Sequence, residues 1–240
     1  MQLQPSVIIA FAATIGLASP VVAQQNPVVV ELYTSQGCAA CPPADDLLNE
    51  MALHDEILPL ALHVDYWDYI GWADTFGHPA FSERQKSYAR KMGRKSVYTP
   101  QMIIGGLHDV PGNATMQVMG LVAEHRMNPF GAGRVTVEIA DRADGGVTIT
   151  VQAHDVLEYA TDVQLVRFLD EATVEILSGE NAGRDITYRN IVTDWSVLGA
   201  WNGAQSFTYT VTDDLPEGSG LAVVVQEQGL GPILGAARYP

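Results

Sequence analysis

The 240-residue sequence has 47% hydrophobic and 17% charged residues, which is typical of a globular protein, and it is longer than one average domain. Its 28 acidic residues outnumber its 13 basic residues and give a formal net charge of −15. This charge argues against nucleic acids and anionic membrane surfaces as general partners.

Residues 1–23 have the pattern of a targeting segment. An apolar stretch from Val7 to Ala18 is followed by small residues that are suited to cleavage after Ala23. We expect a signal peptide and a periplasmic or secreted mature protein, with no integral membrane segment after cleavage, because the stretch is short for a membrane span. Since no Lys or Arg precedes Val7, two alternatives stay open: a start codon further upstream, or a short uncleaved anchor.

The only two cysteines of the chain, Cys38 and Cys41, follow a predicted buried strand. The apolar run from Val28 to Tyr33 indicates the strand, and residues 34–37 indicate a turn that brings both thiols to the start of a helix. Two thiols with this spacing can close a disulfide, and the helix dipole favours the thiolate. The pair predicts redox or metal chemistry. The alternative is a permanent structural disulfide, although so small a loop adds little stability.

The next elements predict a β-α-β unit. Helical periodicity follows Pro42, and the apolar run 57–64 indicates a second strand that is buried on both faces, as in a parallel sheet. An aromatic loop over residues 65–79 leads to a helix around residues 81–92. Six of the thirteen basic residues lie in and just after this helix: Arg84, Lys86, Arg90, Lys91, Arg94 and Lys95. This basic cluster is either a solvated helix face or a surface that steers an acidic substrate.

The remaining sequence predicts a change from mixed to all-β structure. Residues 97–110 indicate a β-hairpin that turns at Gly105 and Gly106, and a helix is expected over residues 114–125. From Arg134 onward, apolar residues recur at every second position between turns, which is typical of an antiparallel sandwich of about seven or eight strands. We place the boundary between two domains within residues 127–133.

The element order and several motifs resemble the thioredoxin fold and, more narrowly, the DUF1223 family of exported thioredoxin-like proteins. The motifs are Val-Glu-Leu-Tyr-Thr-Ser-Gln-Gly-Cys-Ala-Ala-Cys-Pro-Pro-Ala-Asp, His-Val-Asp-Tyr-Trp-Asp-Tyr-Ile-Gly-Trp, Val-Tyr-Thr-Pro-Gln-Met and Gly-Glu-Asn-Ala-Gly-Arg. The resemblance implies an α/β thioredoxin-like domain over residues 24–128 and an all-β sandwich-like domain over residues 134–240. It also implies a cis-proline at Pro100, whose backbone would lie against the two cysteines.

A dithiol mechanism would give roles to four residues. Cys38 would be the exposed nucleophile and Cys41 the more buried resolving thiol. Pro100 would offer its backbone to the substrate. Glu31, on the strand before the motif, is either a proton relay for Cys41 or a buried carboxylate that backbone and hydroxyl donors hold in place.

Other side chains are candidates for binding. Four would form a substrate groove beside the dithiol: Thr99, Tyr66, Trp67 and Trp72. The aromatic members could instead pack against the C-terminal part of the chain. His63 and Asp65 alternate onto one strand face, where they could act in acid–base chemistry or metal binding, or His63 could be a hydrogen-bonded core histidine. Met116 and Met119 are expected to pack in the core rather than bind copper.

The leading hypothesis is an exported thiol–disulfide oxidoreductase that acts on a protein or small-molecule thiol or disulfide and has no resident cofactor. One alternative is a soft-metal protein, in which the two cysteines and a nearby histidine bind or deliver copper(I). Another is a non-catalytic envelope module, in which the predicted sandwich binds a partner and the dithiol part is a scaffold.

Overall fold

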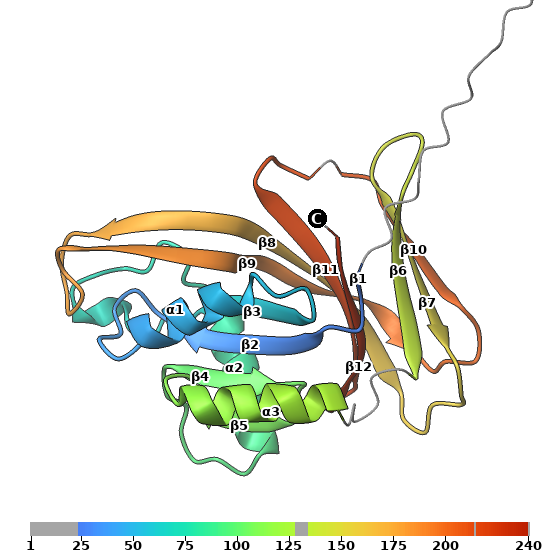
Figure 1. The fold of residues 1–240 in the computed structure, drawn as a ribbon, viewed down its shortest axis with the longest axis horizontal. Helices are drawn as coiled ribbons and strands as arrows, with labels where there is room; N and C mark the ends of the chain where they lie inside the picture. Colours follow the sequence, from blue (N-terminus) through green and yellow to red (C-terminus); the bar gives the residue numbers. More distant parts are fainter. Residues whose placement is uncertain (1–23, 128–133, 214, 240) are drawn as a thin grey trace, which may run out of the picture.

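Strand pairing joins the two halves of the chain into one large sheet. The computed structural model describes residues 24–127, 134–213 and 215–239. Nine strands form a mixed sheet in the order β1-β12-β11-β8-β9-β3-β2-β4-β5, and three form a second sheet in the order β10-β7-β6 (Figure 1). The strands of the large sheet are β1 (Gln24–Gln25), β2 (Val28–Thr34), β3 (Ile57–His63), β4 (Gln101–Ile104), β5 (His108–Pro111), β8 (Thr161–Ile176), β9 (Arg184–Trp201), β11 (Ser219–Glu227) and β12 (Ile233–Tyr239). Those of the second sheet are β6 (Val135–Asp141), β7 (Val147–Ala153) and β10 (Phe207–Val211).

The elements that surround the cysteines follow the predicted order. The helices in the described residues are α1 (Pro42–Met51), α2 (Pro79–Lys91) and α3 (Thr115–Met127), with one short 3₁₀ turn at Asp68–Ile70. Helix α1 connects the parallel strands β2 and β3, so the predicted β-α-β unit is confirmed. The predicted hairpin is also confirmed: β4 and β5 are antiparallel, and Gly105 and Gly106 both have positive φ at its turn.

The predicted fold class, a thioredoxin-like α/β domain followed by a separate all-β sandwich, is wrong. The described chain is mostly strand, and β8, β9, β11 and β12 continue the same sheet that contains β2 to β5. The junction is the parallel pairing of Ala61 in β3 with Ile191 in β9. The alternating pattern after Arg134 predicts strands, but it carries no information about which sheet edge each strand joins. Only β6, β7 and β10 form the second layer, which packs on one end of the large sheet.

Two predictions from the sequence concern segments that the structure does not describe. Residues 1–23 hold the predicted signal peptide, and residues 128–133 hold nearly all of the predicted boundary. Both lie outside the described residues. The proposed limits 24–128 and 134–240 therefore stay a prediction.

The helices cover opposite faces of the sheet around β2. Helices α1 and α3 pack on the face to which Val30 and Leu32 point, whereas α2 packs on the face of Val29 and Tyr33. Figure 1 shows α1 and α3 in front of the strands and α2 behind them. Because successive side chains of a strand point to opposite faces, the position of a residue in β2 or β3 tells which helix it can contact. This alternation decides which side chains can reach the cysteines.

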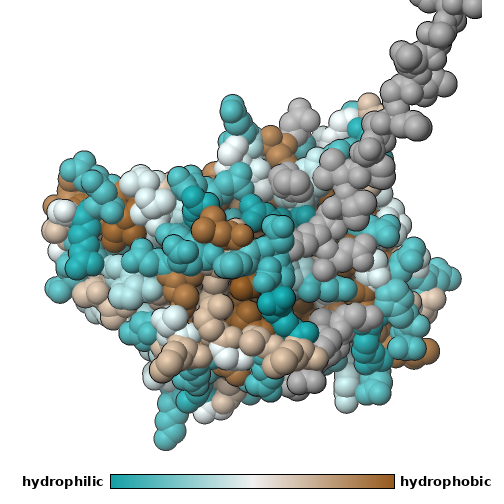
Figure 2. Space-filling model, viewed as in Figure 1, coloured by the Kyte–Doolittle hydropathy of each residue, from teal (hydrophilic) through white to brown (hydrophobic). Residues whose placement is uncertain are grey.

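One face of the molecule shows how polar and apolar residues are distributed on the surface. Figure 2 shows a face that is largely hydrophilic, with hydrophobic residues in scattered small groups. Within the ranges that the structure describes, no helix is both long and apolar enough to cross a membrane.

Candidate functional site

Cys38 and Cys41 form a disulfide at the turn between β2 and α1, with their Cα atoms 5.4 Å apart. The turn is tight because the N–H of Cys38 donates to the carbonyl of Ser35 (3.0 Å) and the N–H of Cys41 donates to the carbonyl of Cys38 (3.1 Å). Cys41 is the N-cap residue of α1, so its sulfur lies at the positive end of the helix dipole. Cys38 is only 2% exposed and is therefore not the exposed thiol that the sequence predicts, whereas Cys41 is fully buried, as predicted. Ala39 and Ala40, between the two cysteines, are exposed.

Gln36 and Asn181 hold this turn in place. The amide of Asn181, in the loop between β8 and β9, donates to the carbonyls of both Gln36 (2.9 Å) and Cys38 (3.0 Å). The side chain of Gln36 donates to the hydroxyl of Thr75 and accepts from the indole N–H of Trp72. The long β8–β9 hairpin thus covers the dithiol turn. Neither residue was a candidate from the sequence, although Asn181 lies in the noted Gly-Glu-Asn-Ala-Gly-Arg motif.

A buried acid, Asp45, lies one helical turn after Cys41. Its N–H donates to the carbonyl of Cys41 (3.1 Å), and its Oδ1 accepts from the hydroxyl of Thr34 at the end of β2 (2.7 Å). Its Oδ2 is buried and has no hydrogen-bond partner. Burial raises the pKa of Asp45 from 3.8 to about 7, although His63 and the Thr34 hydroxyl oppose the rise.

His63 forms a buried pair with a second acid beside this site. Its Nδ1 lies 2.8 Å from Oδ2 of Asp74, and both side chains are fully buried. Oδ2 of Asp74 also accepts from the N–H of Gln36 (2.7 Å), which ties the pair to the dithiol turn. Burial alone would raise the pKa of Asp74, but His63 and the hydrogen bonds lower it below its ordinary value. His63 thus matches the predicted hydrogen-bonded core histidine, and its predicted face partner Asp65 instead accepts from Ser82 (2.5 Å).

Tyr188 of β9 closes the cluster from the C-terminal half of the chain. Its ring packs edge-on against His63, with 4.8 Å between the ring centroids. Burial and then the nearby carboxyls of Asp45 and Asp74 raise its pKa. The hydroxyl of Tyr188 and Nε2 of His63 are buried and have no hydrogen-bond partner. One cluster beside the dithiol turn thus contains Thr34, Asp45, His63, Asp74 and Tyr188.

Glu31 lies on the opposite face of the sheet from α1 and Cys41. Its two oxygens accept four hydrogen bonds, two from Arg84 (2.7 and 2.9 Å) and one each from Tyr33 (2.8 Å) and Tyr88 (2.7 Å). Glu31 and Tyr33 share the β2 face that α2 covers. These contacts match the predicted held carboxylate in part: hydroxyl donors are present, but the guanidinium of Arg84 takes the place of the predicted backbone donors. The structure does not bring Glu31 to the dithiol.

Pro100 lies at the entrance of β4, beside the end of β2 that leads into the dithiol turn. The Thr99–Pro100 peptide is cis, as the resemblance implied. Tyr33 pairs with Gln101, so the register places Pro100 next to the last residue of β2. A Cβ built on Gly112 would lie 3.0 Å from Cβ of Ala44 and 3.2 Å from Cβ of Pro100, so Pro100 and the first turn of α1 flank the same glycine.

The aromatic loop divides into two parts. The indole N–H of Trp67 donates to the hydroxyl of Thr99 (2.7 Å), and a Cβ at Gly37 would lie 3.4 Å from Cβ of Trp67. Thr99 and half-buried Trp67 therefore lie beside the dithiol turn. The hydroxyl of Tyr66 donates to Gln85 of α2 (2.9 Å) and also interacts with the side chain of Thr99. Trp72 packs on the β8–β9 hairpin, as the packing alternative predicts.

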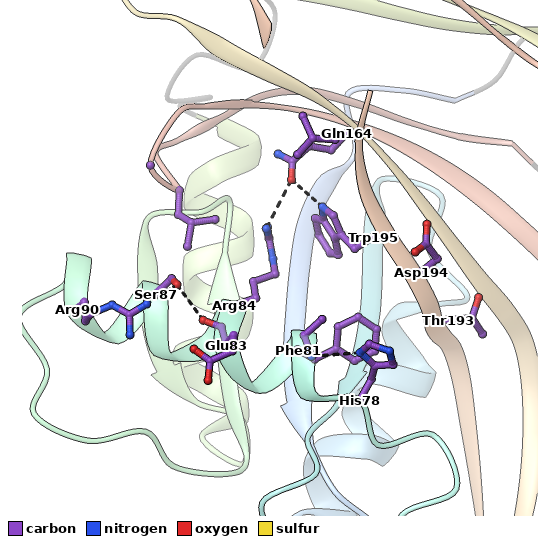
Figure 3. Close-up of a pocket in the computed structure, with 14 residues that line it drawn as sticks. His78, Phe81, Glu83, Arg84, Ser87, Arg90, Gln164, Thr193, Asp194 and Trp195 are labelled. Carbon is purple, nitrogen blue, oxygen red and sulfur yellow. Dashed lines mark hydrogen bonds between the residues drawn. The ribbon is translucent and has the colours of Figure 1, made fainter. Parts of the chain in front are cut away.

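In the basic cluster only Arg84 departs from the expected solvated helix face, since the other five residues are exposed or partly exposed. Arg84 is not solvated: its guanidinium pairs with Glu31 and stacks 3.8 Å from the ring centroid of Trp195. It lines a cavity of about 610 Å³ between α2 and β9 that contains neither cysteine (Figure 3). Because Glu31 already neutralises Arg84, this cavity offers no free buried charge for a ligand. Met116 and Met119 are 91% and 39% exposed, so their predicted core packing is wrong.

Metal ligands are not clustered in the part of the chain that the structure describes. It holds no group of three or more His, Cys, Asp or Glu side chains that could bind a metal ion.

Fold and site together define a β-rich protein with a single dithiol at a strand-to-helix turn. Residues 29–226 match the family described as "Protein of unknown function (DUF1223)", and the chain belongs to this family. It is similar to a protein of Agrobacterium tumefaciens known from a crystal structure, with 32% identity and a TM-score of 0.77 over 90% of this chain and 95% of that one. It shares a fold with HBP35 of Porphyromonas gingivalis, with 12% identity and a TM-score of 0.64 over 90% of this chain and 75% of that one. No curated protein matches the chain.

Proposed function

We propose that the protein is a thiol–disulfide oxidoreductase that works through Cys38 and Cys41. The observation that carries the proposal is the Cys38–Cys41 disulfide at the N-terminus of α1, in which Cys38 keeps slight exposure and Cys41 has none. We therefore assign the attack of an incoming thiolate to the sulfur of Cys38, the less buried of the two residues. A closed loop of this size contributes little stability to the chain, so a purely structural role gives a weak account of it.

The exchange transfers two electrons without a resident cofactor. A substrate thiolate attacks the sulfur of Cys38, a new S–S bond forms, and Cys41 leaves as a thiolate. A second substrate thiolate then attacks the substrate sulfur of this mixed disulfide and releases Cys38. The substrate dithiol is oxidised to a disulfide, and the protein gains both electrons. Run in reverse, the same steps oxidise the protein dithiol and reduce a substrate disulfide.

The surroundings of the dithiol supply a docking place for the substrate. The cis Thr99–Pro100 segment and Trp67 lie on one side of the turn, and exposed Ala39 and Ala40 form its outer surface. An extended peptide could lie across this surface and bring its own sulfur to Cys38. Of the four predicted binding residues, Thr99 and Trp67 fit this role. Tyr66 also donates to Gln85 of α2, and Trp72 donates to Gln36 of the turn while it packs on the β8–β9 hairpin.

Equilibration with glutathione at defined ratios of reduced to oxidised form tests the proposal. We expect the pair to cycle reversibly at potentials that glutathione mixtures reach. A Cys41→Ser variant should accumulate a mixed disulfide at Cys38, and the matched Cys38→Ser variant should not. A pair that stays oxidised in the most reducing mixture would exclude the oxidoreductase and leave the structural disulfide.

We further propose that residues 1–23 direct export, which would place the disulfide in an oxidising compartment. Cell fractionation of the full chain and of a variant that starts at residue 24 tests this. A full-length protein that stays in the cytoplasm would contradict it.

A further inference from the structure

We propose that the Asp45 carboxyl gives a proton to the Cys41 sulfur when the disulfide opens and takes the proton back when the disulfide closes. The inference rests on the proposed oxidoreductase function and adds a proton-transfer residue to it. Glu31 was the candidate from the sequence, but it lies on the other face of the sheet, with all its hydrogen-bonding positions taken.

The need for a local proton donor follows from the burial of Cys41. Its sulfur lies in a residue with no exposed surface, so water cannot solvate the thiolate that forms when the S–S bond breaks. A buried, unsolvated charge is costly unless it is neutralised or paired. The helix dipole of α1 offsets part of this cost. A proton from a neighbouring acid removes the charge altogether.

Asp45 has the position for this transfer. It lies four residues after Cys41 on the same helix, where side chains of such pairs are neighbours, about 5–6 Å apart at Cβ. Helical side chains tilt toward the N-terminus, so the carboxyl of Asp45 lies back over the turn that holds Cys41. Thr34 anchors Oδ1, and the buried Oδ2 has no hydrogen-bond partner. Oδ2 is thus the free position for the transferred proton.

The charges that face Asp45 suit reversible transfer. Titratable groups reach it from every element packed around it: His63 on β3, Asp74 in the loop after β3, Tyr188 on β9 and Asp46 on α1 itself. Asp74 and Asp46 favour the protonated form, and His63 favours the ionised form. Because these influences and burial bring the pKa of Asp45 to about 7, both forms are well populated at neutral pH.

The step balances as follows. A substrate thiolate attacks Cys38, the S–S bond breaks, and Cys41 leaves with the bonding electron pair. The Asp45 carboxyl transfers its proton to that sulfur and becomes a carboxylate. When the disulfide closes again, the carboxylate removes the proton from the Cys41 thiol, whose sulfur attacks Cys38 of the mixed disulfide and expels the substrate thiolate.

The test measures how fast dithiothreitol opens the disulfide of the full chain between pH 5 and 9, with each rate divided by the concentration of dithiothreitol thiolate. We expect this normalised rate to fall as pH rises through about 7 in the native protein, because Asp45 loses its proton there. Asp45→Asn should be slower by about 10- to 100-fold at pH 6, near the lower end of general acid–base contributions, and should show no such fall.

Two further variants separate proton transfer from a structural effect. Asp46→Asn removes an exposed neighbouring carboxyl whose influence on Asp45 is the smallest of those named, so the variant should keep nearly the native rate, with the fall moved only slightly to lower pH. Thr34→Val removes the hydroxyl that favours the ionised form of Asp45, so the fall in rate should move to higher pH. This shift decides the question even if Asp45→Asn does not fold, which circular dichroism would show.

The outcomes distinguish the two proposals. A pair that cycles in glutathione, with Asp45→Asn matching the native rate and profile, would overturn the role of Asp45 and leave the oxidoreductase intact. An unchanged profile in Thr34→Val would also count against it. Failure of the native disulfide to open would overturn both proposals.

Discussion

Two buried acids, Glu31 and Asp45, lie on opposite faces of the same sheet and differ in how they are compensated. Glu31 accepts four hydrogen bonds and pairs with Arg84, so both of its oxygens have partners. Asp45 has one side-chain partner, Thr34, and a buried oxygen without any. The first arrangement fixes a charge in place, whereas the second leaves a carboxyl that can gain or lose a proton. Of the two, only Asp45 lies on the helix that begins at Cys41.

Removing the partner of Glu31 should have the largest effect on stability. Arg84→Met leaves a fully buried carboxylate without its cation, which typically costs about 3–5 kcal/mol. Urea unfolding at pH 7 measures this loss. The matched control is Lys86→Met on the same helix, whose ion pair with Glu83 is exposed, and it should change the free energy of unfolding by less than about 0.5 kcal/mol. Equal effects of the two substitutions would show that Glu31 is not held as we describe.

Asp45 should make stability depend on pH in the opposite sense from an ordinary buried ion pair. Its pKa is about 7 in the folded protein and 3.8 ordinarily, so the folded state binds the extra proton between these values. The protonated carboxyl of Asp45 therefore adds to the free energy of unfolding. This added stability is complete below pH 3.8 and is lost as the pH rises through 7. At about 1.4 kcal/mol per pH unit, the loss is at most about 4 kcal/mol.

Asp45→Asn should remove this pH dependence. Relative to the native protein, the variant should therefore gain stability steadily between pH 4 and pH 8, as urea unfolding at several pH values would show. Asp46→Asn, with its exposed side chain, should show no such gain. A constant difference between Asp45→Asn and the native protein across this range would mean that Asp45 is ionised throughout.

His63 should contribute less, through its pair with Asp74. His63→Gln removes a buried hydrogen bond to a charged group, which is worth about 1.5–3 kcal/mol. It also removes an influence that lowers the pKa of Asp45, so the pH dependence assigned to Asp45 should extend to higher pH. His54→Gln, at an exposed histidine that follows α1, is the matched control. If His63→Gln loses stability but its pH profile does not move, His63 does not influence the pKa of Asp45.

The difference between the two acids also shows what the sequence can predict. The strand, the turn and the helix start around Cys38 and Cys41 follow from local pattern, and so does the hairpin at Gly105 and Gly106. Glu31 was a candidate because it precedes the motif on the same strand. Its face, however, depends on the alternation of side chains along β2, and its partner Arg84 is distant in sequence.

The contribution of the C-terminal half could not be predicted in the same way. Asn181 and Tyr188 reach the dithiol region only because β9 pairs with β3 at Ala61 and Ile191, a single long-range register. Alternating apolar residues predict a strand in either sheet equally well. The fold class was wrong for this reason, and the same pairing brings the unrecognised residues to the site.

Asn181 tests this contact between the halves with the smallest expected effect. Asn181→Ala removes two hydrogen bonds to the backbone of the dithiol turn, which should cost about 1–2 kcal/mol. Because Asn181 holds the carbonyl of Cys38, its loss should also loosen the turn and let dithiothreitol open the disulfide several-fold faster. Glu180→Ala, in the same loop but exposed, should change neither quantity. If opening is no faster in Asn181→Ala, the β8–β9 hairpin positions the sheet without limiting access to Cys38.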